Sequence, residues 1–242
     1  MKKLLPLLCL LLLCLLLLCG CTQQSPADEP PPTVPLHSDL YLPGLEVDEV
    51  LTYFNEVCLD AEITNSGDPS RLQKWDAPLR YTLLGQPTAR DRSNAEEFAR
   101  WLNTIEGFPG MAETTDANAA NLTIHFCPED EMIALMGDWA AGLDGAVTFW
   151  YENDAIYQAV ICCRSDIDQD IRSSVLLEEL YNGLGPVQDT ALRPDSIIYA
   201  EYSTPQRLSD VDELLLRLLY HPTLQPGMGR AACSEAIQQL YQ

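Results

Sequence analysis

The stretch Ser173–Asp189, SSVLLEELYNGLGPVQD, decides the fold of this chain. Leucines recur through it at helical spacing and Gly185 follows the last of them, which predicts an amphipathic helix that ends at a glycine. Two adjacent acids, Glu178 and Glu179, lie in the middle of the predicted helix. The central question is therefore whether this helix carries an active site.

The first twenty residues have the pattern of a secretory signal peptide. Lys2 and Lys3 precede a leucine-rich run, and Leu18-Cys19-Gly20-Cys21 follows it, so we expect residues 1–20 to be removed. The last four residues resemble the lipobox of bacterial lipoproteins, which implies cleavage before Cys21 and acylation of its thiol. An uncleaved membrane anchor is the alternative, since the apolar run nearly reaches the roughly 20 residues that span a bilayer. We expect the lipoprotein, because a polar segment begins directly after Cys21.

Lipidation would also determine where the protein is. The chain would lie outside the cytoplasm and would be anchored to the cell membrane by its N-terminal lipid. Residues 21–43 are polar and rich in proline, which predicts an extended tether without a core. Residues 44–242 have the length of one globular domain.

The composition restricts the possible partners. The formal net charge is -22 and the pI is about 4.2. Such a surface repels phosphate backbones and anionic lipid head groups, so we expect no nucleic-acid partner and no membrane contact beyond the lipid. Solubility is a sufficient explanation for the acidity.

Five cysteines remain after those of the signal peptide and Cys21 are set aside. They are Cys58, Cys127, Cys162, Cys163 and Cys233. None has CxxC spacing, which argues against a zinc ribbon. Buried free thiols and one or two disulfides both remain open, and the spacing does not decide the pairing. If Cys162 and Cys163 lie in a strand, their side chains point to opposite faces of the sheet.

The apolar periodicity predicts a mixed α/β (α+β) fold in which helices pack a small sheet. The predicted strands are residues 79–84, 121–126, 146–151 and 155–163, the last two forming a hairpin. Further helices are predicted at about 45–65, 93–105, 209–221 and 230–241, with a short one after Pro128. Ser93 and Glu96 have the spacing of a capping box at the start of the second of these helices.

Several motifs then resemble a bacterial family of lipoproteins of unknown function. In the opening stretch they are Glu178-Glu179-Leu180 (EEL), Leu184-Gly185 (LG) and Asp189. The others are Pro194–Tyr199 (PDSIIY) and residues 208–212 (LSDVD), which precede residues 214–222 (LLLRLLYHP). The similarity spans most of residues 45–230 and is strongest over 174–228. The same order of elements is similar to the zincin metalloproteases, and especially to the secreted metzincin branch. The resemblance implies a zincin-like fold.

Zincins hold zinc with a helical His-Glu-x-x-His motif, a following glycine and a third histidine. The resemblance implies that the first ligand position falls on Glu178, the general base on Glu179, the second ligand on Asn182, the glycine on Gly185 and the third ligand on Gln188. Ile198 stands where the family has its methionine turn. All three ligand histidines are replaced, so the metal site is degenerate.

One carboxylate and two amides are poor ligands for zinc, which prefers imidazole, thiolate and carboxylate. We therefore expect no zinc and no other cofactor. Calcium accepts such oxygens, with Asp189 near by, but requires six to eight of them. A structural interpretation also remains open for the acid pair, with one acid in solvent and the other at the sheet edge or capping backbone.

Other candidate motifs are weaker. His37, His125 and His221 have no ligand spacing in common. Asp166, Asp168 and Asp170 resemble the start of an EF-hand loop, but Ile171 replaces the required glycine, and acids at a helix start are explained by the helix dipole.

Two functions follow as hypotheses. In the first, an inactive zincin-like domain is a binding or scaffold module for a cell-envelope protein or peptide. In the second, the protein is a cell-envelope hydrolase of peptide or glycan in which Glu179 is the general base. A third possibility is that only the anchor and the acidic surface matter. The missing histidines favour the first.

Overall fold

The structure is a computed structural model that describes residues 38–60, 71–201 and 204–241. The predicted signal peptide, the lipidation site Cys21, His37 and most of the tether lie outside the described residues. So does the predicted helical segment beyond residue 60. No helix in the described ranges is both long enough and apolar enough to cross a membrane.

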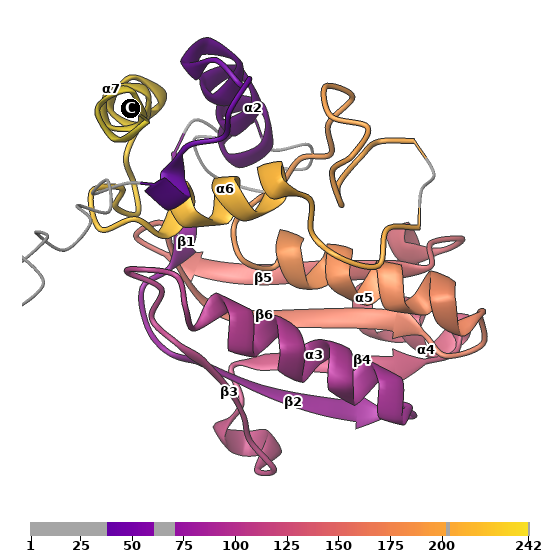
Figure 1. The fold of residues 1–242 in the computed structure, drawn as a ribbon. Helices are drawn as coiled ribbons and strands as arrows, with labels where there is room; N and C mark the ends of the chain where they lie inside the picture. The colour runs from indigo at the N-terminus through magenta and orange to yellow at the C-terminus, as the bar shows by residue number, and fades with distance from the viewer. Residues whose placement is uncertain (1–37, 61–70, 202–203, 242) are drawn as a thin grey trace, which may run out of the picture. The chain divides into compact units, whose positions relative to one another are not determined.

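The fold is mixed α/β, as predicted, and is built on a six-stranded sheet (Figure 1). The strands are β1 (Lys74–Trp75), β2 (Leu79–Gly85), β3 (Met111–Glu113), β4 (Leu122–Cys127), β5 (Gly145–Glu152) and β6 (Ala155–Arg164). They follow the order β1-β6-β4-β2-β3, with β5 also paired to β6. Every pairing is parallel except that of β5 with β6.

The antiparallel strand β5 lies at one edge of the sheet. Cys162 pairs with His125 of β4 on one side and with Ala146 of β5 on the other. Asn153 and Asp154 make the turn between β5 and β6 with φ of 52° and 64°. This is the backbone that a two-residue hairpin needs, and Asn and Asp tolerate it better than other non-glycine residues. The predicted hairpin is confirmed.

Helices cover the two faces of the sheet unequally. They are α2 (Val47–Leu59), α3 (Ala89–Leu102), α4 (Glu129–Met136), α5 (Gln169–Asn182), α6 (Asp210–Tyr220) and α7 (Arg230–Leu240). Helices α3 and α5 run side by side over one face, and α4 lies against β6 (Figure 1). Cys163 belongs to the main core whereas Cys162 belongs to a smaller cluster with Met132 of α4, so α4 lies on the opposite face.

The predicted helices and the four predicted strands are present, but the start predicted for α3 was wrong. The helix begins one turn earlier, where Thr88 and Asp91 form the capping box instead of Ser93 and Glu96. Tertiary contacts select this start, since the Thr88 hydroxyl donates to the Gln169 side chain at 2.8 Å. Asp91 is fully buried and pairs with Arg172 of α5 at 3.3 Å.

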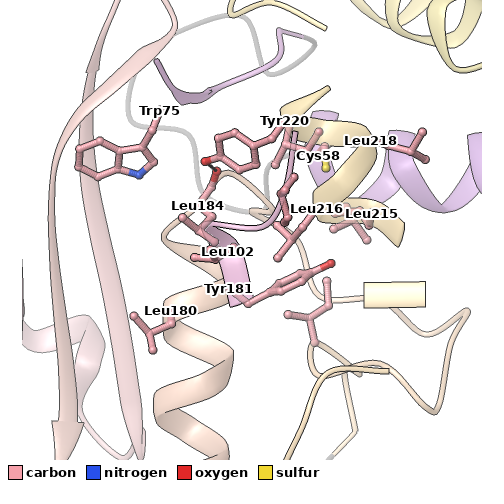
Figure 2. Close-up of a cluster of buried hydrophobic side chains, with 14 of the residues drawn as sticks. Cys58, Trp75, Leu102, Leu180, Tyr181, Leu184, Leu215, Leu216, Leu218 and Tyr220 are labelled. Atoms are coloured by element: carbon pink, nitrogen blue, oxygen red, sulfur yellow. Dashed lines mark hydrogen bonds between the residues drawn. The ribbon is translucent and has the colours of Figure 1, made fainter. Parts of the chain in front are cut away.

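Side chains from distant parts of the chain satisfy the backbone at the end of α5. The indole of Trp75 donates to the carbonyl of Gly183 at 2.8 Å, and the hydroxyl of Tyr220 donates to the carbonyl of Leu184 at 2.7 Å. The last carbonyls of a helix have no partner within it, so buried ends require such donors. Figure 2 shows the surrounding leucines and both aromatic rings in this part of the core. The position of α5 is thus fixed by β1 and α6.

All five cysteines of the described chain are buried free thiols. Of the two alternatives that the sequence left open, the structure has the free thiols.

Candidate functional site

The candidate site is the C-terminal half of α5, which carries the acid pair. Asp168 begins the helix and accepts from the backbone N–H of Asp170 at 2.8 Å. The helix packs against α3, β5 and β6. After Gly183, the chain turns at Gly185 with φ of 128°, a value that favours glycine. These constraints place Glu178 and Glu179 beside the antiparallel edge of the sheet.

Glu179 is buried against the first residue of β5. It is 8% exposed. A Cβ atom added to Gly145 would lie 3.0 Å from Oε1 of Glu179 and 2.2 Å from a methyl group of Val175. Glycine at position 145 therefore leaves the room in which the Glu179 side chain packs. Of the two places that the structural interpretation offered, Glu179 occupies the sheet edge.

The acid pair lies in an electrostatic environment that favours protons. Burial, and then the charge of Asp189, raises the pKa of Glu178 to about 7. Burial raises the pKa of Glu179 well above its usual range, and the charges of Glu178 and Asp189 raise it further. Three carboxyl groups thus influence one another in a partly desolvated site, where like charges disfavour ionisation. Burial and the two neighbouring acids therefore favour the protonated form of Glu179.

The two amide positions of the degenerate site are partly buried. Oδ1 of Asn182 is buried and has no hydrogen-bond partner among the described residues. Gln188 lies between Val187, whose N–H donates to the Val57 carbonyl at 2.8 Å, and Asp189. Asp189, the next residue, is close enough for its charge to act on both Glu178 and Glu179.

These residues do not fit a zinc ion. Zinc sites are built from imidazole, thiolate and ionised carboxylate, whereas the three ligand positions hold one carboxyl with a raised pKa, Glu178, and the neutral amides of Asn182 and Gln188. In the described parts of the chain, no three His, Cys, Asp or Glu side chains form a group that could hold a metal ion. A carboxyl group in its protonated form can instead donate a hydrogen bond to a carbonyl or hydroxyl oxygen.

The other candidate residues lie apart from this helix end. His125 is on β4, where burial lowers its pKa, and Nδ1 of His221 contacts Thr223 after α6. Asp168 caps α5, and the Asp166 carboxylate accepts two hydrogen bonds from Arg164. Asp168 and Asp170 thus lie at the start of α5, where acids complement the helix dipole.

A groove of about 750 Å³ lies elsewhere, between residues 42–45 and the start of α6. Its lining includes Arg193, Asp195, Arg207 and Glu213, so it is polar with charges of both signs. It contains none of the residues of the acid site. Sequence patterns did not indicate this groove, because its two walls are more than 150 residues apart in the chain.

The raised pKa of Glu178 leads to a prediction about stability and pH. In the folded protein its pKa is about 7, against about 4.3 for an unfolded glutamate. Between these values the folded state binds more protons, so the free energy of unfolding falls as pH rises through 7. We expect Glu178→Gln to reduce this fall by about 1–3 kcal/mol between pH 5 and pH 8, as measured by urea unfolding.

Glu106→Gln, at an exposed acid, is the matched control and should leave the pH dependence as it is in the wild type. Parallel curves for the wild type and Glu178→Gln would contradict the assignment.

The fold and the site together define a class: a mixed α/β protein in which a helix packed on the sheet carries two adjacent carboxyl groups with raised pKa values. Residues 48–239 match the model of a family described as a protein of unknown function, DUF2927. The chain therefore belongs to the DUF2927 family. No curated protein matches the chain.

Proposed function

We propose that the protein is a lipoprotein, anchored through Cys21 outside the cytoplasm, whose zincin-like domain binds a cell-envelope protein or peptide and does not hydrolyse it. The N-terminal pattern supports the anchor, since Leu-Cys-Gly precedes Cys21 and a proline-rich segment follows it.

Three features support a zincin-like ancestry. The helix with the acid pair lies beside an antiparallel edge strand, β5. Gly185, at the position of the zincin glycine, has a positive φ. Ile198, at the position of the methionine turn, is buried in the main core. The groups that build such a scaffold are thus retained while the ligand histidines are replaced.

The burial of Glu179 against β5, close to two other acids, is the single observation that carries the proposal. A general base must be ionised to accept a proton, and efficient bases have a pKa near the working pH. Burial and two neighbouring acids hold the pKa of Glu179 well above its usual range. This environment disfavours the negative charge that a base needs.

The same chemistry indicates the ligand. Neutral carboxyl groups donate hydrogen bonds to acceptors such as the carbonyl oxygens of an extended peptide. Because Glu178 has a pKa of about 7, it changes between donor and pure acceptor near neutral pH. A peptide ligand would then bind more tightly at pH 6 than at pH 8.

Metal analysis and activity assays test this proposal. We expect the protein, purified without a chelator, to hold zinc far below one equivalent. We also expect no turnover on peptide and glycan panels with several divalent cations added. Stoichiometric zinc that Glu178→Ala removes would refute the loss of the metal site.

The hydrolase hypothesis instead predicts turnover that depends on Glu179, which the variant Glu179→Gln tests. If Glu179 is a general base, this variant loses turnover while its thermal midpoint stays near that of the wild type. Glu178→Gln is a useful companion, because it removes the neighbouring carboxyl and leaves Glu179 in place. If Glu179→Gln abolished turnover and Glu178→Gln did not, the hydrolase hypothesis would replace the proposed binding function.

A further inference from the structure

Two thiols lie in contact on the face of the sheet opposite α5. Cys127 of β4 is register partner to Arg164, and Cys162 of β6 is register partner to His125. The two cysteines are therefore diagonal neighbours on adjacent parallel strands, with side chains on the same face. Both cysteines belong to one buried cluster, and both are free thiols.

Helix α4 adds two more sulfur atoms to this place. Met132 is fully buried against the thiols, and the partly buried Met136 packs on the same group. We call these four residues, Cys127, Cys162, Met132 and Met136, the sulfur cluster. Ala140, Ala146 and Val160 belong to the same hydrophobic cluster. The protein has five methionines, so two of them in one small cluster concentrate soft donors there.

The surroundings of the sulfur cluster favour a cation. The charges of Glu131, Asp130 and Asp166 add to burial in raising the pKa of the Cys127 thiol. Nearby Arg164 is held by acids of its own, at 3.0 Å from Asp166 and 3.6 Å from Glu129. Negative potential of this kind raises the local concentration of cations.

We propose that the sulfur cluster is a site for a soft monovalent cation, Cu(I), with the thiolates of Cys127 and Cys162 as ligands and the thioether of Met132 as a third donor. Thiolate and thioether ligands select Cu(I) over harder ions. Binding replaces two protons, so Cu⁺ and two thiols give a bis-thiolate complex of charge -1 and two released protons. No oxidant or reductant is needed.

Zinc does not suit the same place. A closed zinc site takes four donors, usually imidazole or thiolate. His125 lies opposite Cys162, but within the described chain it does not complete a metal-holding group with the two cysteines. Two thiolates and thioethers in an apolar cluster match the low coordination numbers of a soft ion instead.

Competition with a chromophoric Cu(I) chelator tests the proposal, on the reduced full-length protein without oxygen. We expect one Cu(I) per protein at this site, with two protons released. Cys127→Ser and Cys162→Ser should each weaken Cu(I) binding by about 100-fold or more, and Met132→Leu by about tenfold. All variants keep the other cysteines, so background binding to those thiols is the same throughout.

Cys163→Ser is the matched control, because Cys163 is the next residue on β6 and faces the main core. It should keep the affinity of the wild type for Cu(I). An equal loss in Cys163→Ser and Cys162→Ser would overturn the proposal, as would wild-type binding no tighter than that of Cys127→Ser.

A second measurement covers the case in which a serine variant does not fold. X-ray absorption of the Cu(I)-loaded wild type should show a first shell made of two or three sulfur atoms. A shell dominated by nitrogen or oxygen would exclude the sulfur cluster as the site.

Discussion

Asp212→Ala is expected to lower the free energy of unfolding by about 3–5 kcal/mol. Asp212 is fully buried near the start of α6. Its carboxylate accepts from the Ser196 hydroxyl at 2.6 Å and from the Ile197 N–H at 3.0 Å, and the Ser209 N–H donates to it at 2.8 Å. Alanine would leave several buried donors without an acceptor, which costs more than the loss of the bonds alone.

Denaturant unfolding of Asp212→Ala beside Asp210→Ala measures this effect. Asp210 lies on the same first turn but is exposed, so its loss should cost only the helix-dipole term of about 0.3–1 kcal/mol. Asp212→Asn, which keeps one acceptor oxygen, should fall between the two. If Asp212→Ala cost no more than Asp210→Ala, the carboxylate would not be what joins the segment around Ser196 to α6.

Gly185→Ala is the second large effect, with an expected loss of about 3–5 kcal/mol. The backbone of Gly185 has φ of 128°, which disfavours residues with a side chain. A Cβ atom there would lie 2.4 Å from the carbonyl oxygen of Gln73. The oxygen belongs to backbone next to β1, so the strand would have to move and its contact with the end of α5 would weaken.

Gly142→Ala separates the two causes. Gly142 has φ of 81°, but nothing lies within 4 Å of an added Cβ atom. Its substitution should cost only the conformational penalty, about 1–2 kcal/mol. Thermal or urea unfolding of both variants measures the two losses in the free energy of unfolding. Equal losses would show that the close approach to the Gln73 carbonyl does not add to the cost of Gly185→Ala.

The sequence predicted elements well where the signal was local. The alternation in β4 and β6 and the Ser209 cap of α6 are properties of a few neighbouring residues, and all three elements are present. Strands β1 and β3 were missed, because two or three residues carry no measurable period. Strand order was also out of reach, since β6 pairs with residues some 37 to 81 positions earlier in the chain.

The sequence predicted which residues form the site, but not the pKa values of its acids. The resemblance selected Glu178 and Glu179 from the pattern of α5, and the two lie together with Asp189 in the structure. The raised pKa values could not be read from the sequence, because they depend on burial against β5 and on the space at Gly145. The contact between Cys127 and Cys162 is a matter of register between two strands, which the spacing of 35 residues does not reveal.

The contacts near residues 40 and 240 have a consequence for the order of folding. The Tyr241 hydroxyl donates to the Leu45 carbonyl at 2.7 Å and accepts from the Leu42 N–H at 3.3 Å, across almost 200 positions. Helix α2 packs on α7, and Lys74 donates to the carbonyl of Leu219 at 2.9 Å. Long-range closures of this kind slow folding, because the entropy of a large loop is lost before its contacts form. The contacts between α2 and α7 can therefore form only after nearly the whole chain has been synthesised, so this part of the core is completed late.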